Sequence, residues 1–271
     1  MQEVYSIMDV PLIGLGTYNL LGKECTKIVR AALEMGYRHI DTAHSYANHK
    51  AIGKALKTHK RDSFFLTSKL ALEEVDPKNI ARSVELACSR ALKELETQYL
   101  DLYLIHWPDR TLDISAIFAS LDDLKAKGLI RHAGVSNFTI HHLQDLARDG
   151  YHPDANQVEF HPYLYQKELL AFCKEHQISL IAYRPLGKGE LLHTREVQAI
   201  AKAHEKTAAQ ILLRWLVQQS IPTIPKASSF AHLRENFDLF NFFLTKEEMH
   251  KLNCLNKNKR FCIADHPEFL Y

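Results

Sequence analysis

The sequence lacks long apolar runs and an excess of charge of one sign. Apolar stretches such as ILL and WLV, on either side of Arg214, are far shorter than the ~20 residues that span a bilayer. The N-terminal MQEVYSIMDV has no basic segment followed by an apolar one, so we expect no secretory signal and a cytoplasmic protein. The 34 Lys and Arg against 32 Asp and Glu give a net charge of +2, which disfavours a nucleic-acid partner.

Paired cysteine motifs and metal-binding histidine motifs are also missing. The five cysteines are odd in number and form no CxxC, which indicates reduced, buried thiols; they are Cys25, Cys88, Cys173, Cys254 and Cys262. The sixteen histidines contain neither HExxH nor HxH, and the adjacent His141 and His142 would point to different faces of a helix or strand. We therefore expect no metal site built by the protein.

Nothing in the composition suggests a second domain. The 271 residues contain no Pro/Gly/Ser-rich linker, low-complexity tract or literal repeat, and α/β barrels of this length are single domains. We expect one domain over residues 1–271. Because no long apolar seam is visible, we also expect a monomer.

Short apolar runs alternate with longer segments whose apolar residues lie three and four apart. One such segment ends at Gly36 and another at Gly128, both typical helix stops. Eight run–helix units predict a (β/α)8 TIM barrel, with short substrate loops and a short C-terminal tail. The competing doubly wound sheet is disfavoured, because Gly14-Leu15-Gly16 lacks the third glycine of a dinucleotide fingerprint. The runs are LIGLGT (12–17), RHIDT (38–42), FFLTSK (64–69), LDLYLIH (100–106), RHAGVSN (131–137), ANQVE (155–159), SLIAY (179–183) and PTIPK (222–226).

Polar residues stand at the ends of these runs, where a barrel places its active site. A tyrosine with a pKa near ~10 needs help to exchange a proton at neutral pH. Lys69, kept charged by Asp41, could give that help to Tyr46, and His106 could orient a carbonyl oxygen. A purely structural Asp41–Lys69 ion pair is the alternative. The run ends are Tyr18, Asp41, Lys69, His106, Ser136 and Asn137, Gln157, Tyr183 and Lys226.

At these residues the sequence resembles the aldo-keto reductase family over almost its whole length. Five ordered segments carry the resemblance: GYRHIDTAHSYANHKAIG (36–53), LIHWP (104–108), GVSNF (134–138), NQVEFHPY (156–163) and the IPK…EN stretch (224–236). The resemblance implies a (β/α)8 barrel that reduces aldehydes and ketones with NADPH and without a metal.

The resemblance also implies roles for individual residues. Tyr46 would be the general acid, Asp41 and Lys69 would tune it, and His106 would orient the substrate carbonyl. The expected nicotinamide contacts are Ser136, Asn137 and Gln157 to the carboxamide and Tyr183 stacked on the ring, with Leu186 nearby in the following strap. Tyr18 and Trp107 match aromatic pocket walls, although either could be plain packing.

The far end of the cofactor site departs from the family pattern I-P-K-S-x4-R. Lys226 is kept, but Ala227 replaces the serine and His232 replaces the arginine. Histidine lacks the bidentate fork of arginine, so we expect a reduced preference for NADPH over NADH. Arg184 and Lys188, in the strap AYRPLGK, could partly compensate, unless Arg184 faces solvent. Two further residues, Glu235 and Asn236, match the adenine-contacting pair.

Two loops that enclose substrate in this family are short here. About four residues (109–112) follow His106-Trp107-Pro108 before the next helical pattern, and 17 residues (255–271) follow the last one. We expect an open mouth and small, polar carbonyl substrates, as in the bacterial 2,5-diketogluconate and methylglyoxal reductases, whose internal NxE pattern is altered here to Asn48-His49. The tail could fold over the pocket as an aromatic flap, pack on the barrel wall or stay disordered; its apolar residues are Phe261, Phe269, Leu270 and Tyr271.

Two other function classes deserve comparison. A non-catalytic, nucleotide-binding subunit of the same family is the first alternative, and the intact Asp-Tyr-Lys-His set argues against it. A metal-dependent barrel hydrolase is the second, and the missing HxH motif disfavours it.

Overall fold

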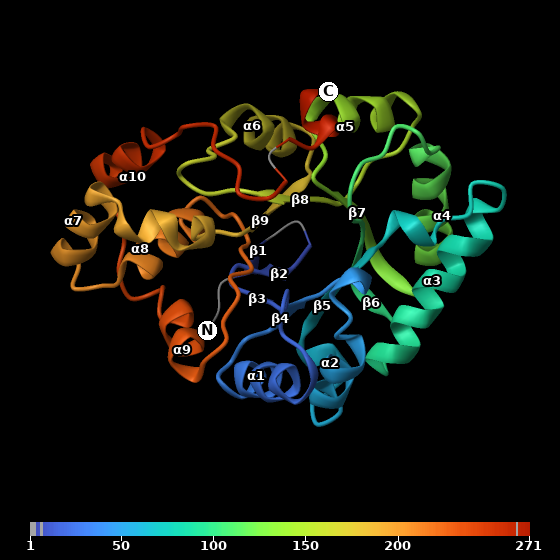
Figure 1. The fold of residues 1–271 in the computed structure, drawn as a ribbon, viewed down its shortest axis with the longest axis horizontal. Helices are drawn as coiled ribbons and strands as arrows, with labels where there is room; N and C mark the ends of the chain where they lie inside the picture. Colours follow the sequence, from blue (N-terminus) through green and yellow to red (C-terminus); the bar gives the residue numbers. More distant parts are fainter. Residues whose placement is uncertain (1–3, 6–7, 264) are drawn as a thin grey trace.

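A curved sheet of seven parallel strands forms the centre of the computed structural model, which describes residues 4–5, 8–263 and 265–271. Each strand pairs with the next one along the chain, and the helices surround the sheet (Figure 1). Parallel strands must be joined by a crossover, and because crossovers are short, each strand lies beside the next one along the chain. The strands are β3 (Leu15–Gly16), β4 (His39–Asp41), β5 (Phe65–Leu70), β6 (Leu100–Ile105), β7 (Ile130–Ser136), β8 (Ala155–Glu159) and β9 (Ser179–Tyr183).

An extended segment rather than a regular strand closes the barrel. Thr223 forms bridges to Ile13 on one side and to Ala182 on the other, and Lys226 bridges to Gly16. The expected (β/α)8 fold is confirmed, but the run 222–226 is not an eighth strand. Its two prolines, at positions 222 and 225, have no N–H to donate to a ladder.

The helices and short 3-10 turns follow the strands around the barrel (Figure 1). Gly36 (φ 106°) and Gly128 (φ 71°) follow the first and fourth helix, as the sequence predicts. The helices are α1 (Gly22–Glu34), α2 (His49–Leu56), α3 (Ile80–Leu95), α4 (Ile114–Ala126), α5 (Ile140–Arg148), α6 (Lys167–Glu175), α7 (Arg195–Ala203), α8 (Ala208–Val217), α9 (Phe230–Phe237) and α10 (Lys246–Asn253). The 3-10 turns are η1 (His44–Tyr46), η2 (Arg61–Ser63), η3 (Leu72–Glu74), η4 (Gly187–His193) and η5 (Pro267–Leu270). No helix within the described residues has the length and apolar character of a membrane span.

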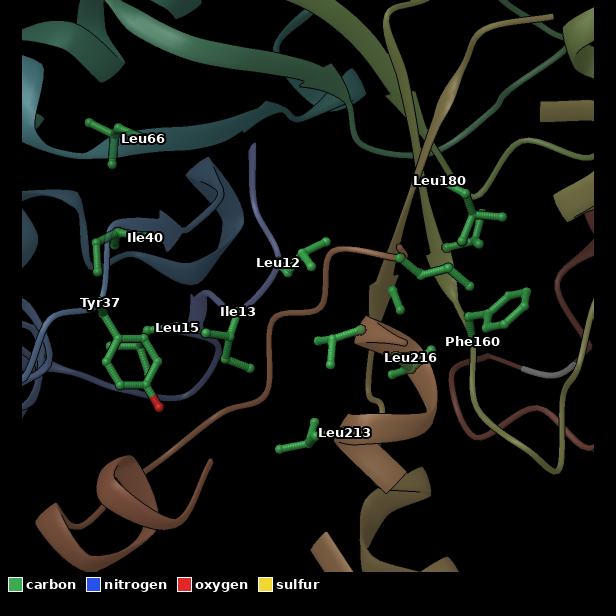
Figure 2. Close-up of a cluster of buried hydrophobic side chains, with 14 of the residues drawn as sticks. Leu12, Ile13, Leu15, Tyr37, Ile40, Leu66, Phe160, Leu180, Leu213 and Leu216 are labelled. Atoms are coloured by element: carbon green, nitrogen blue, oxygen red, sulfur yellow. The ribbon is translucent and has the colours of Figure 1, made fainter. Parts of the chain in front are cut away.

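The main hydrophobic core fills the layer between the strands and the surrounding helices. Helix α8 is buried along its whole length, and Leu213 and Leu216 join Ile13 and Phe160 in the same cluster (Figure 2). Strands buried on both faces explain why the runs are continuously apolar.

An N-terminal hairpin, which the sequence analysis missed, covers one end of the barrel. Strands β1 (Val4–Tyr5) and β2 (Val10–Pro11) pair antiparallel. Met8 and Val10 pack in a separate cluster with strand residues that include Leu102 and Ile181. The cluster includes Phe65 and Ala155, the first residues of β5 and β8, so it lies toward the amino ends of these strands.

The cysteines are free thiols, as expected, but not all are buried. Burial raises the pKa values of Cys25, Cys88 and Cys173 to about 12, so these thiols are unreactive. Cys254 is exposed and Cys262 is half-buried, which makes the expectation wrong for both. Both lie in the C-terminal region, whose tail crosses the barrel mouth to end beside α5 (Figure 1).

Truncating the core should reduce stability in proportion to burial. Leu216 in α8 is 0% exposed and Leu270 in the tail is 92% exposed. We expect Leu216→Ala to lower the free energy of unfolding by about 2–5 kcal/mol, because it leaves a cavity. The control Leu270→Ala should change it by less than about 0.5 kcal/mol. Urea unfolding measures both, and equal effects would contradict the assignment of the core.

Candidate active site

A cavity of about 610 Å³ opens at the carboxyl ends of the strands. Most residues that the sequence analysis selected line it, and they come from different strands and their following loops. This convergence follows from the parallel barrel, in which every strand ends at the same mouth. The expected residues at the cavity are Tyr18, Asp41, Tyr46, His106, Trp107, Ser136, Asn137, Gln157, Tyr183, Arg184, Leu186, Lys188 and Lys226.

A buried ion pair lies beneath this cavity. Lys69 Nζ on β5 donates to Asp41 Oδ1 on β4 at 2.6 Å and to the Thr42 carbonyl oxygen at 3.0 Å. Gln157 Nε2 donates to the other carboxylate oxygen, Asp41 Oδ2, at 2.7 Å. Burial opposes the ammonium charge of Lys69, but Asp41 and Tyr46 together outweigh it and raise the pKa of Lys69 above its usual value. Lys69 is therefore charged at neutral pH.

Tyr46 lies directly above this ion pair. It ends the turn η1, which follows β4, and its ring centre is 5.2 Å from Lys69 Nζ. The edge of Tyr18 packs against it, with ring centres 5.1 Å apart. Burial raises the pKa of Tyr46, and the positive charge of Lys69 opposes that shift. The phenol is thus protonated at neutral pH, with a cation positioned to stabilise the phenolate once the proton leaves.

His106 faces Tyr46 from the end of β6. The two ring centres lie 5.9 Å apart. Burial, assisted by the charge of Lys69, lowers the pKa of His106 to about 3. The backbone of this residue is fixed, because its N–H donates to the Leu70 carbonyl and its carbonyl accepts from Asn137 Nδ2 at 3.0 Å. A neutral, fixed imidazole can donate one hydrogen bond to a carbonyl oxygen in the cavity.

Amide and hydroxyl side chains form the floor beside these groups. Ser136 Oγ donates to the Gln157 carbonyl at 2.8 Å, and Asn137 Nδ2 donates to Ser136 Oγ at 3.1 Å. Tyr183 OH donates to Asn137 Oδ1 at 2.7 Å. Asn137 has a left-handed backbone (φ 67°), a conformation that asparagine tolerates better than most residues. The network links the polar groups at the ends of β7, β8 and β9 to one another.

The far end of the cavity is basic, and no residue of α9 is part of its lining. Lys188 and Lys226 line the cavity and have no ion-pair partner among the described residues. Arg184 also lines it, and its Nη1 donates to the Phe261 carbonyl at 2.6 Å, so its guanidinium is tied to the tail rather than facing solvent. Three predicted residues lie on α9 away from the cavity lining: His232 is exposed, Glu235 is half-buried and Asn236 is buried.

The C-terminal tail contributes cavity residues that the sequence analysis did not select. Cys262 and Ile263 line the main cavity. The Phe261 and Cys262 N–H groups donate to the Glu159 carboxylate at 2.7 and 2.8 Å. No local pattern in the tail predicts this placement, because the acceptor lies about a hundred residues away.

Only part of the tail forms an aromatic flap, which is one of the three possibilities that the sequence leaves open for it. Phe269 packs on Trp107 with ring centres 5.8 Å apart, and His266 stacks on the same indole at 4.8 Å. Tyr271 instead packs on α5, where its hydroxyl donates to Asp145 at 2.6 Å. Leu270 is exposed. The mouth is therefore narrower than its short loops suggest.

A second cavity of about 500 Å³ adjoins the first. Both include Ser45, His106, Trp107 and Ile263 in their walls. The second is acidic but not uniformly polar, because Glu73, Asp109 and Glu268 line it together with apolar residues such as Leu72 and Ile263. A molecule whose reactive atom lies between Tyr46 and His106 could extend into this space.

Comparisons with known proteins agree with this geometry. A profile described as "Aldo/keto reductase family" matches residues 12–257. Glyoxal reductase of Bacillus subtilis (strain 168) is 40% identical over 272 residues, covering 99% of this chain and 96% of its own. Aldose reductase B of Dictyostelium discoideum is 39% identical, covering 94% and 92%. Among solved structures, aldose reductase from Schistosoma japonicum superimposes with a TM-score of 0.88 at 35% identity, covering 96% and 95%.

The buried histidines predict a loss of stability in acid. Burial lowers the pKa values of His39 and His106 to about 3 and that of His49 to about 4, against ~6.5 in the unfolded chain. Between these values the unfolded state binds more protons, so stability falls as the pH falls from about 6.5 to 4. Each histidine contributes a slope of about 1.4 kcal/mol per pH unit.

Urea unfolding between pH 7 and 4.5 measures this slope. His39→Asn should reduce the slope by about 1.4 kcal/mol per pH unit, the contribution of one proton, whatever its effect on stability at pH 7. His152→Asn is the matched control, because His152 is exposed, and it should leave the slope unchanged. A slope that is the same in all three proteins would contradict a neutral, buried His39.

Proposed function

The chain belongs to the aldo/keto reductase family, and we propose from this premise that it reduces small, polar aldehydes and ketones to alcohols with NADPH. The observation that carries the proposal is the stack of Asp41, Lys69 and Tyr46 beneath a cavity, with the neutral His106 beside it. This arrangement offers a proton and a hydrogen bond to one oxygen atom.

The chemistry of the cavity fits a nicotinamide dinucleotide. The amide and hydroxyl groups of Ser136, Asn137 and Gln157 suit a carboxamide, and the ring of Tyr183 offers a flat face. Lys188 and Lys226, which lack ion-pair partners among the residues described, suit phosphate groups at the other end of the cavity. When bound, a reduced nicotinamide supplies a hydride to the carbonyl carbon.

Residues of this chain would bind the carbonyl oxygen of the substrate and supply its proton. His106 would hold the carbonyl oxygen through a ring N–H, which fixes the carbonyl relative to Tyr46. Tyr46 would donate its phenolic proton to that oxygen as negative charge develops there. Lys69 would stabilise the resulting phenolate, and the Asp41 carboxylate keeps that lysine charged and in place.

Small, polar substrates fit the space and polarity near the reacting groups. The second cavity continues past Trp107 and carries the carboxylates of Glu73 and Asp109. Ile263 of the tail lines both cavities. Similarity to glyoxal reductase supports the same class, since a dicarbonyl is small and hydrophilic.

Removing the Tyr46 hydroxyl should abolish turnover and spare cofactor binding. We expect Tyr46→Phe to lower kcat/KM by about 10²–10⁴-fold, the contribution of a general acid. The assay is NADPH oxidation with methylglyoxal, phenylglyoxal, nitrobenzaldehyde, diketogluconate and glyceraldehyde. NADPH affinity, measured by fluorescence, should stay within about threefold of wild type, because the substitution retains the aromatic ring.

Tyr18→Phe is the matched control. Tyr18 packs on the ring of Tyr46, and it is the Tyr46 ring over which the Lys69 ammonium lies. The kcat/KM of Tyr18→Phe should fall by less than about tenfold. Persistent turnover in Tyr46→Phe would refute the mechanism. Wild-type protein that binds NADPH yet turns over none of the carbonyls would favour the non-catalytic, nucleotide-binding alternative.

The preference for NADPH over NADH should be modest, and an arginine substitution at position 232 should increase it. His232 at the exposed start of α9 cannot form the two parallel bonds of an arginine, and a charge-assisted bond contributes about 1.5–3 kcal/mol. We expect His232→Arg to raise the ratio of kcat/KM for NADPH to that for NADH by about 10–100-fold. His152→Arg, a change of the same charge at an exposed site remote from the cavity lining, should leave the ratio unchanged. A wild-type ratio above about a thousandfold, or one that His232→Arg does not alter, would contradict this prediction.

A further inference from the structure

Two histidines and a glutamate converge outside both cavities, where the turn η1 and the start of α2 meet the last turn of α3. One potential ligand atom from each of His44, His49 and Glu94 lies within 4.8 Å of the other two. None of the three lines the main cavity or its neighbour. The cluster is therefore separate from the site proposed for carbonyl reduction.

Close packing of two helices fixes His49 and Glu94 opposite each other. His49 and Gly53 lie one turn apart on the same face of α2. A Cβ atom at Gly53 would lie 2.8 Å from the Glu94 carbonyl oxygen, so only glycine allows the helices to approach this closely. The approach brings His49 Nδ1 to 3.5 Å from Glu94 Oε2.

One ring nitrogen of His49 is buried without a hydrogen-bond partner. The residue is 2% exposed, and its Nε2 lies 3.0 Å from Ser68 Oγ, which fixes the ring orientation. Its Nδ1, on the side that faces Glu94, makes no hydrogen bond. A buried polar atom without a partner is costly. A histidine whose ring is fixed by a hydrogen bond at one nitrogen, with the other nitrogen facing further potential metal-ligand atoms, is typical of a metal ligand.

His44 completes the set from the opposite side. Its ring centre lies 6.2 Å from that of His49, and its side chain is half-exposed on the short turn η1. Its Nδ1 lies 3.6 Å from a carboxylate oxygen of Glu74, which also pairs with Arg90. Arg90 offsets the charge of Glu74, so the carboxylate that would favour a cation between the histidines is Glu94, whose partner Lys50 lies 3.9 Å away on an exposed side chain.

Contrary to the expectation from the histidine spacing in the sequence, we propose that His44, His49 and Glu94 bind a zinc ion, with solvent as the fourth ligand. Two imidazoles and one carboxylate are a common zinc ligand set that leaves one coordination position open. Zinc–ligand bonds of about 2.0–2.2 Å place tetrahedral ligands roughly 3.3 Å apart. The ligand atoms must therefore close by up to about 1.5 Å, and His44 on its exposed turn is the residue free to make this movement.

Zinc titration of the full chain tests the proposal. Exposed Cys254 lies 3.5 Å from His250 Nε2 and could capture zinc separately, so every protein carries Cys254→Ser. After treatment with EDTA and its removal, isothermal titration calorimetry with Zn²⁺ should show one site per chain. Zinc at about 100 times its Kd should also raise Tm by roughly 5 °C or more.

Single-ligand variants connect the signal to the cluster. His44→Gln and Glu94→Gln should each weaken zinc binding by at least about tenfold and remove most of the Tm shift. Matched controls are His152→Gln and Glu96→Gln, which should match the parent; Glu96 pairs with Lys57 instead. His44 is half-exposed, so its variant should fold, and the Tm without zinc checks this.

Two outcomes would overturn the proposal. One is the absence of zinc binding below about 100 µM in the Cys254→Ser parent. The other is parental affinity in both His44→Gln and Glu94→Gln. Either result is independent of carbonyl reduction, because the test reads binding and thermal stability alone.

Discussion

The ion pair between Asp41 and Lys69 constrains the whole mouth of the barrel. Both side chains are almost completely buried, and removing two charges from water costs several kcal/mol for each ion. That cost is offset only by complete hydrogen bonding, here from Gln157 Nε2 to the carboxylate and from the ammonium to the Thr42 carbonyl. The pair therefore fixes β4, β5 and β8 relative to one another, and removing one partner would leave an uncompensated charge in the core.

The charge of Lys69 also determines the protonation of its neighbours in opposite ways. For His106 it acts in the same direction as burial and favours the neutral ring. For Tyr46 it acts against burial and favours the phenolate. One buried cation thus favours the neutral imidazole, which keeps a single N–H to donate, and makes the phenol a better acid than its burial alone would allow.

The sequence predicts residues whose positions follow from the parallel barrel itself. Asp41, Lys69 and His106 end consecutive runs, and consecutive parallel strands end at one mouth, so their proximity needs no further information. The run 222–226 shows the limit of this reasoning, because its two prolines prevent a regular strand although the segment lies in the eighth position. The contact between His49 and Glu94 was not predictable, since it depends on how closely two helices approach at Gly53.

The position of the tail was not predictable from the sequence either, because main-chain N–H groups rather than side chains anchor it to the barrel. Glu159 on β8, two residues after Gln157, is fully buried and accepts hydrogen bonds from two tail N–H groups and from His161. Burial alone would raise the pKa of Glu159, but these donors outweigh it and lower the pKa, so the carboxylate stays charged. Because main-chain atoms anchor the tail, many sequences at positions 261 and 262 would satisfy Glu159 equally well. The tail side chains are then free to differ without loss of the anchor, and Cys262 and Ile263 shape the cavity wall on a backbone whose position is set by the barrel.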